Sequence, residues 1–151
     1  MNVATKSNGA GEPTRVTFRL RASLAHRSLA IDLVSTLVEH VTKDRGFRND
    51  ITTAFGEAFN NVVIHGYRNR TDGMLDVEAE LGSEHMTLRL IDDGLQADLS
   101  SVKPPNLDTL PEGGLGIFMI HALVDEVVYN SGTPNVLSLT KRTTPAESAS
   151  K

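Results

Sequence analysis

The stretch that decides the fold runs from Arg48 to Tyr67 and reads RNDITTAFGEAFNNVVIHGY. Its apolar residues recur three and four positions apart, a spacing that predicts a helix with one buried face. These residues are Ile51, Ala54, Phe55, Ala58, Phe59, Val62 and Val63. Asn49 or Asp50 is expected to cap the start of this helix, and Gly66 is expected to end it.

A row of polar residues accompanies the apolar face, because Glu57, Asn61 and His65 follow one another at intervals of four positions. Polar groups at the edge of a buried face need partners, since desolvation without one is costly. An Asn oxygen suits Mg²⁺ that also binds phosphates, and a Glu one turn away can accept a proton from an attacking hydroxyl. The same two residues would also suit a partly exposed helix flank. His65 is expected to be a hydrogen-bonded histidine and not a metal ligand.

Alternating and helical patterns predict the elements on either side of this helix. In chain order they are a strand over Thr14–Arg21, a helix from Ser23 to Gly46, strands over 75–81 and 86–90 joined as a hairpin, a helix over 117–124, and strands over 125–129 and 136–142. This order favours an α+β fold, a two-layer α/β sandwich with a mixed, mostly antiparallel sheet and helices on one face. We expect one domain over residues 14–142, with flexible tails at 1–13 and 143–151.

Composition excludes several classes of function. The chain has 151 residues, a net charge of -4 and no basic cluster, which disfavours a nucleic-acid surface. It has no cysteine, so thiolate catalysis and cysteine-bound zinc are excluded. It also has no long apolar run, so no membrane contact is expected and a cytoplasmic location is the default.

Two further segments could carry chemistry. Asp92–Gly94 ends a predicted strand, where a buried Asp could accept a hydrogen bond from an exocyclic amine such as that of adenine. Gly113–Gly116 opens a helix after the long, proline-containing segment Leu95–Glu112, which is typical of a lid, a binding loop or a disordered stretch. Backbone N–H groups at such a helix start can bind phosphate. Taken singly, the first segment could be an Asp-Gly turn and the second a tight turn.

The order and spacing of these motifs are far more specific than any one of them. Glu57-Ala58-x-x-Asn61-x-x-x-His65-Gly66-Tyr67 resembles the N box of the GHKL ATPases, the histidine kinase-like superfamily. Asp92-x-Gly94 resembles its G1 box, Gly114-x-Gly116 its G2 box, and Gly132-Thr133 the Gly-Thr near its last strand. The His-Gly-Tyr version in a domain of this size resembles the anti-sigma factor serine kinases. The resemblance covers the chain from about Thr14 to Arg142.

The resemblance implies ATP and Mg²⁺ as cofactors and a role for each matching residue. Glu57 would be the general base, and Asn61 would bind both the nucleotide and Mg²⁺. Asp92 would recognise the adenine amine, with Gly94 allowing close approach of the base. The remaining nucleotide contacts would come from Gly114, Leu115, Gly116 and Thr133. One position departs from the family pattern, because Gln96 stands where the G1 box usually has its second glycine. Lys103 is a candidate for the γ-phosphate on position alone.

For the whole protein the resemblance implies an anti-sigma factor that is also an ATP-dependent protein serine kinase. Its substrate would be an anti-anti-sigma antagonist of the STAS type, its second partner a sigma factor or an equivalent regulator, and a homodimer is implied as well. Two alternatives stay open. One is a non-catalytic, nucleotide-gated module that binds a partner, which Gln96 slightly favours. The other is the ATPase module of a sensor histidine kinase or of an Hsp90-like clamp.

Overall fold

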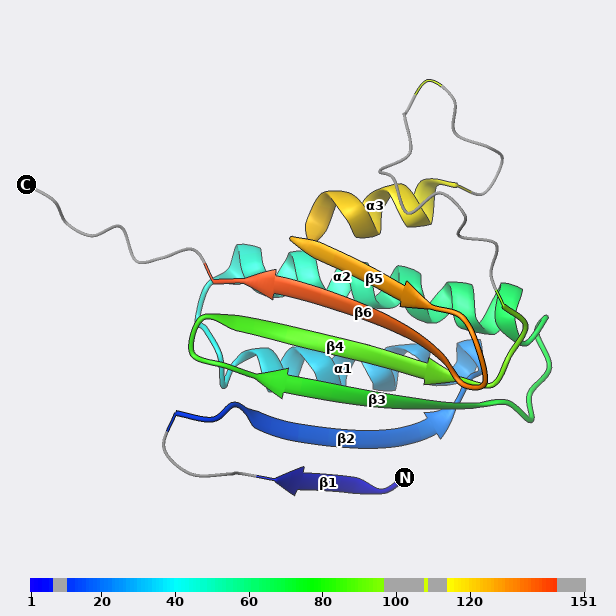
Figure 1. Ribbon diagram of the computed structural model, residues 1–151, viewed down its shortest axis with the longest axis horizontal. Helices are drawn as coiled ribbons and strands as arrows, with labels where there is room; N and C mark the ends of the chain where they lie inside the picture. The colour runs from blue at the N-terminus through cyan, green and yellow to red at the C-terminus, as the bar shows by residue number, and fades with distance from the viewer. Residues whose placement is uncertain (7–10, 97–107, 109–113, 144–151) are drawn as a thin grey trace, which may run out of the picture.

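The computed structural model describes residues 1–6, 11–96, 108 and 114–143. Its elements are β1 (Val3–Lys6), β2 (Thr14–Arg21), the 3-10 turn η1 (Leu24–His26), α1 (Arg27–Val38), α2 (Arg45–Asn61), the π-helical turn η2 (Val62–Gly66), β3 (Met74–Leu81), β4 (His85–Asp92), α3 (Leu115–Leu123), β5 (Glu126–Asn130) and β6 (Asn135–Arg142). Figure 1 shows the strands as one sheet with the helices behind it.

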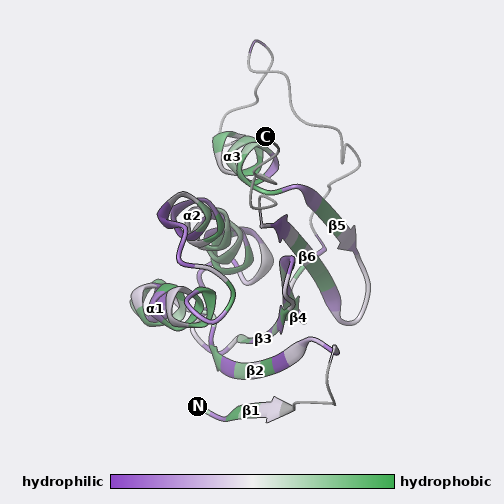
Figure 2. Cartoon of the chain, turned by 90° about the vertical axis from the view of Figure 1, so that its left-hand side faces the viewer, coloured by the Kyte–Doolittle hydropathy of each residue, from purple (hydrophilic) through white to green (hydrophobic). Residues whose placement is uncertain are grey.

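The sheet has six strands in the order β1-β2-β3-β4-β6-β5. Every pairing between these strands is antiparallel, so the parallel component that a mixed sheet would need does not occur among them. The helices cover one face, with α2 between α1 and α3 (Figure 2). The predicted α+β two-layer sandwich is therefore confirmed.

The core lies between the sheet and α2. Alternate residues of β2 are buried, among them Val16, Phe18 and Leu20, and they belong to the same core cluster as the apolar faces of α1 and α2. Phe55 and Phe59 of α2 are completely buried, with ring centroids 6.3 Å apart. Each such side chain contributes roughly 1.5–3 kcal/mol by leaving water, so the predicted apolar stripe does hold the two layers together.

The central helix begins earlier than expected. Asp44 caps α2, because its Oδ1 accepts hydrogen bonds from the backbone N–H of Gly46 at 2.8 Å and of Phe47 at 3.4 Å. The predicted caps Asn49 and Asp50 therefore lie inside the helix. Gly46 does not end the preceding helix either, since α1 already ends at Val38 and Gly46 belongs to the first turn of α2.

The N-terminal part of the chain also differs from expectation. Ser23 does act as a cap, but for η1, where its hydroxyl accepts a hydrogen bond from the Ala25 N–H. Residues 1–13 were expected to be a flexible tail, yet Val3–Lys6 form β1, which pairs with β2 at one edge of the sheet. An edge strand gains its backbone hydrogen bonds from its neighbour, and so short a strand leaves little sequence signal. Most of the other tail, 144–151, lies outside the described residues.

Within the described residues, no helix is both long enough and apolar enough to cross a membrane.

Candidate active site

The candidate site is built on the C-terminal end of α2. The helix continues directly into η2, where the Tyr67 N–H donates to the carbonyl of Val62 at 2.9 Å, five residues back. Such π-helical turns are rare and are found frequently at functional sites. Glu57 and Asn61 occupy the last turns of α2, immediately before this irregularity.

The polar atoms of the Glu57 and Asn61 side chains have no partner among the described residues. Both side chains are half-buried, and neither forms a hydrogen bond or an ion pair with another residue that the structure describes. Among the described residues, neither side chain contributes a fully buried polar atom without a partner. A carboxylate and an amide in this state are available to a ligand, and the Asn61 oxygen fits a cation that keeps most of its waters.

The first turn of α3 faces Glu57. A Cβ atom at Gly116 would lie 2.8 Å from Glu57 Oε2, so a larger residue there would displace the Glu57 carboxylate from its present position. Gly114 is the N-cap of α3, and no side chain of the described residues caps this end of the helix. The first N–H groups of α3 are therefore free to bind an anion beside Glu57. Leu115 is 59% exposed, so only its backbone is placed to take part.

Asp92 forms the second part of the site at the end of β4. Its side chain is buried, and its Oδ1 accepts hydrogen bonds from the Gly94 N–H at 2.8 Å and from Asn135 Nδ2 at 3.2 Å. Burial raises the pKa of Asp92 above its ordinary value of 3.8, while these two hydrogen bonds act in the opposite direction. A buried carboxylate held in this way can accept a further hydrogen bond from a ligand.

The turn after Asp92 docks against the end of η2. Leu95 N–H donates to the carbonyl of Gly66 at 2.8 Å, and a Cβ at Gly94 would come within 2.7 Å of that same carbonyl group. Because two backbones meet here, no larger residue fits at Gly94. The contact joins the predicted Asp92–Gly94 motif to the helix that carries Asn61.

Tyr67 stabilises the same corner through its hydroxyl group. Its hydroxyl donates to the Met74 carbonyl at 2.7 Å and accepts from the Asp93 N–H at 2.9 Å, so it links the start of β3 to the end of β4. Burial raises the pKa of Tyr67 above 10.0, and the residue therefore stays a neutral donor and acceptor. Tyr67 thus holds Asp92 at a fixed position relative to η2.

Asn135 is a site residue that the sequence reasoning missed. It is 1% exposed, its Nδ2 donates to Asp92 Oδ1 and to the Gly94 carbonyl at 3.0 Å, and its Oδ1 accepts from the Gly132 N–H at 3.0 Å. The pairing of Asp92 with Asn135 across β4 and β6 brings them together. Thr133 is exposed, and its contribution to nucleotide binding stays a prediction.

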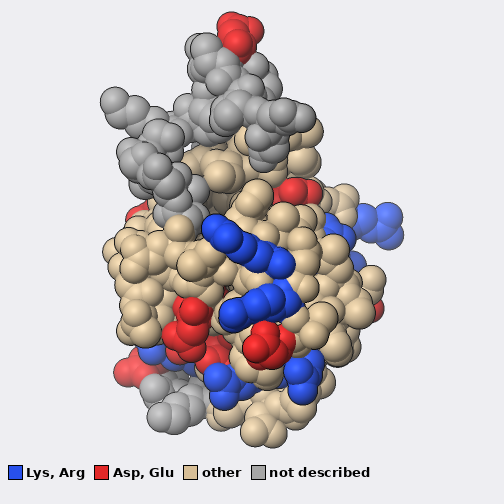
Figure 3. All heavy atoms as spheres, turned by 90° about the vertical axis from the view of Figure 1, so that its right-hand side faces the viewer, with Lys and Arg blue, Asp and Glu red and all other residues tan. Residues whose placement is uncertain are grey.

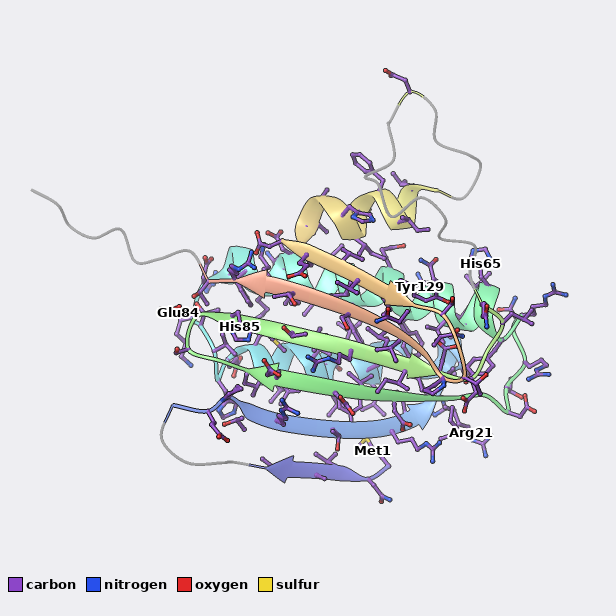
Figure 4. All side chains as sticks on the ribbon, viewed as in Figure 1. Met1, Arg21, His65, Glu84, His85 and Tyr129 are labelled. Carbon is purple, nitrogen blue, oxygen red and sulfur yellow. The ribbon has the colours of Figure 1, made fainter. Side chains whose placement is uncertain are left out.

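Three other expectations concern the surroundings of the site. His65 is exposed at the end of the molecule opposite the hairpin that carries Glu84 and His85 (Figure 4). The hydrogen bond expected for it is absent among the described residues. The side chain of Gln96 is exposed and is therefore not packed into the fold. Lys103 and most of Leu95–Glu112 lie outside the described residues.

The end of the molecule that contains η2 carries basic side chains close to acidic ones (Figure 3). The segment after η2 supplies exposed Arg68 and Arg70, and Arg70 pairs with Asp72 at 3.5 Å. The site thus combines a carboxylate and an amide on α2, an uncapped helix start on α3, and a buried carboxylate at the end of β4. These groups suit a ligand with an amine at one end and negative charge at the other.

Comparison with known proteins agrees with this arrangement. The family model described as "Histidine kinase-like ATPase domain" matches residues 20–141. An anti-sigma F factor of Clostridium beijerinckii is 33% identical over 91 residues, which are 58% of this chain and 64% of that protein. Serine-protein kinase RsbW of Oceanobacillus iheyensis is 30% identical over 90 residues, covering 54% of this chain and 57% of that protein.

A third relative, serine-protein kinase RsbW of Staphylococcus epidermidis, is 28% identical over 135 residues, covering 83% of this chain and 85% of that protein. The chain spans less than two thirds of the length of the first two relatives. The family match, in contrast, extends from the end of β2 almost to the end of β6 and includes every motif described above. This chain therefore belongs to the family of histidine kinase-like ATPase domains.

Proposed function

We propose that this chain is an anti-sigma factor and an ATP-dependent protein serine kinase whose substrate is an anti-anti-sigma protein of the STAS type. The observation that carries the proposal is the Glu57 carboxylate, which has no partner among the described residues and faces the start of α3 at Gly116, where no described side chain forms a cap. A general base next to an anion-binding helix start is what phosphoryl transfer to a hydroxyl requires. Names of the relatives, anti-sigma F factor and serine-protein kinase, support the same function.

The proposed nucleotide contacts extend from β4 to α3. Asp92 accepts a hydrogen bond from the amine of adenine, and Gly94 leaves room for the base. Gly114, Leu115 and Gly116 offer backbone N–H groups to the phosphates, supported by the partial positive charge of a helix start. Thr133 lies on the loop before β6 and is proposed as a further contact.

Asn61 is proposed as the residue that holds Mg²⁺. Its side chain has no other partner in the described structure, and one amide oxygen suits a cation that takes its remaining ligands from water and phosphate. When bound, Mg²⁺ neutralises charge on the phosphates. Asn61 also lies one helical turn from Glu57, so the two groups act on the same end of the nucleotide.

The proposed reaction transfers the γ-phosphoryl group of ATP to a serine of the partner protein. The serine oxygen forms the new bond to phosphorus, the bond from phosphorus to the oxygen of ADP breaks, and Glu57 accepts the serine proton. Catalysis of this kind depends mainly on positioning and charge stabilisation. Release of the phosphorylated antagonist then leaves the kinase free to hold a sigma factor. Because a sigma factor and its antagonist act in the cytoplasm, the proposal includes a cytoplasmic location. It also includes a homodimer.

Calorimetric titration with ATP and Mg²⁺ tests the first half of the proposal. The wild type should bind, and Asn61→Ala should lose the part of the affinity that depends on Mg²⁺. Asn49→Ala is the matched control, because Asn49 is an exposed residue of the same helix. A wild type that binds no ATP at millimolar concentration would refute the nucleotide site.

Phosphoryl transfer to a purified STAS-domain protein tests the second half. Glu57→Gln should abolish transfer while ATP binding is retained. Glu78→Gln is the control and should leave both intact, because Glu78 is a similarly half-buried glutamate that lies on β3. The alternative, a non-catalytic module gated by nucleotide, predicts ATP binding and partner binding with no transfer by the wild type. The two functions are therefore separated by a single assay of ³²P incorporation.

A further inference from the structure

We propose that Asn135 sets the nucleobase preference of this site by turning Asp92 so that one carboxylate oxygen is reserved for the exocyclic amine of a 6-aminopurine. The inference rests on the proposed function, which places the base at Asp92. Asn135 is then a positioning residue, because it acts on the base through Asp92.

The hydrogen bonds of Asp92 are divided unequally between its two oxygens. Oδ1 accepts from both the Gly94 N–H at 2.8 Å and Asn135 Nδ2 at 3.2 Å. Oδ2 has no hydrogen-bond partner in the described part of the chain. Asp92 as a whole keeps 8% of its surface exposed. Asp92 therefore presents one satisfied and one available acceptor.

Three hydrogen bonds fix the orientation of the Asn135 side-chain amide, because each of its two polar atoms faces a group of the opposite hydrogen-bonding type. Its amide nitrogen donates to Asp92 Oδ1 and to the Gly94 carbonyl at 3.0 Å, while its oxygen accepts from the Gly132 N–H at 3.0 Å. Rotation of the amide by 180° would place a donor against the Gly132 N–H and an acceptor against two other acceptors. With 1% of its surface exposed, Asn135 is shielded from the bulk water that could compensate for such a rotation.

The hydrogen bond from Asn135 Nδ2 to Asp92 Oδ1 favours the ionised form of Asp92. Burial and the neighbouring Asp93 carboxylate raise the pKa of Asp92, and the hydrogen bonds from Asn135 and Gly94 lower it. The other titratable group at this corner is Tyr67, whose hydroxyl is occupied by backbone partners. An ionised carboxylate only accepts hydrogen bonds, so it pairs with the amine of adenine and repels the carbonyl of a 6-oxopurine. Removal of Asn135 takes away one of the two hydrogen bonds that lower this pKa.

Comparison of ATP with inosine triphosphate isolates this effect, because the two nucleotides differ only in the purine ring at C6 and N1. Affinities are measured by calorimetry for the wild type, Asn135→Ala and Asn135→Asp, with equilibrium unfolding to verify that each variant is folded. Asn135→Asp keeps the size of the side chain and the acceptor for Gly132 while removing the amide donors. Asn130→Ala is the control, because Asn130 is exposed at the end of β5.

The wild type and the control should bind ATP at least about tenfold more tightly than inosine triphosphate. In both Asn135 variants the ATP affinity should fall towards that of inosine triphosphate, whose own affinity stays within about twofold because its phosphate contacts are untouched. An equal loss for both nucleotides, or an unchanged ratio in either folded variant, would overturn the role of Asn135 while leaving the ATP site intact. A wild type that binds neither nucleotide refutes the proposed function itself.

Discussion

Replacing Lys141 by Met should loosen α3, the helix whose first turn faces Glu57. The ammonium group of Lys141 on β6 donates to the carbonyl of Leu123 at 2.8 Å, in the last turn of α3. It also lies 3.2 Å from Asp50 Oδ2 and 5.8 Å from the centre of the Phe47 ring, both on α2. One side chain thus ties α3 to the sheet and to the central helix.

The expected cost follows from the burial of each partner. The side chain of Lys141 is 16% exposed, so its bond to the Leu123 carbonyl is worth roughly 1.5–3 kcal/mol. Asp50 is 40% exposed, and the ion pair therefore adds only about 0.5 kcal/mol. The cation–π contact adds about 0.5 kcal/mol. Met keeps the apolar stem, and water can reach part of the freed carbonyl, so we expect a net loss of about 2 kcal/mol.

Urea denaturation of the wild type and of Lys141→Met measures this loss, which corresponds to a decrease of roughly 4–8 °C in Tm for a chain of this size. Lys43→Met is the matched control, because Lys43 is exposed between α1 and α2. A double-mutant cycle with Asp50→Asn separates the ion pair from the bond to Leu123. Equal unfolding midpoints for Lys141→Met and Lys43→Met would refute the claim that Lys141 anchors α3.

Three other outcomes are expected from changes elsewhere in the chain. Gly116→Ala should push the Glu57 carboxylate aside and reduce phosphoryl transfer at least about tenfold, with stability within about 1 kcal/mol of the wild type; an unchanged kcat would contradict the contact. Tyr67→Phe should lower the free energy of unfolding by about 1–3 kcal/mol, because two backbone groups lose their partner; urea titration measures this. The hydrogen bond from His85 holds the pKa of Glu80 below its ordinary value of 4.5. The stability gained from this bond is therefore present above that value and lost as the pH falls through the lowered pKa. Unfolding midpoints from about pH 6 to pH 3 should accordingly fall less in Glu80→Gln than in the wild type.

Patterns of period two and 3.6 were sufficient to predict most of the fold. The strand predicted over Thr14–Arg21 is β2 with the same bounds, because its alternate residues face the core and solvent in turn. The start of α2 was misplaced because Phe47, which lies four residues before Ile51 and is also buried, was not counted in the apolar stripe. Counting it would have moved the cap from Asn49 towards Asp44.

Only those residues of the candidate site that lie close together in the sequence could be predicted. Glu57 and Asn61 are related by one helical turn, and their motif is legible in the sequence alone. The π-helical turn that follows them has no recognised sequence signal. Asn135 was missed because its role depends on the register of β6 against β4, which brings it to Asp92 from 43 positions away. Long-range pairing of this kind is a property of the assembled sheet.

The two ends of the candidate site differ in how many of their polar groups have hydrogen-bond partners within the protein, and this difference has a functional consequence. At the Asp92 corner, Asn135 donates to Asp92 and Tyr67 accepts from the Asp93 N–H. The part of the site proposed for the base is therefore preorganised before any ligand binds. At the other end, α3 is anchored through the carbonyl of Leu123, while in the described part of the chain its first turn has no side-chain cap and the Glu57 that it faces has no partner. A triphosphate would supply the missing anionic partner of that helix start. Nucleotide binding should therefore stabilise α3 more than the Asp92 corner, which hydrogen exchange of the α3 amides with and without ATP would measure. Equal protection at both ends would show that the phosphate end is already complete without ligand.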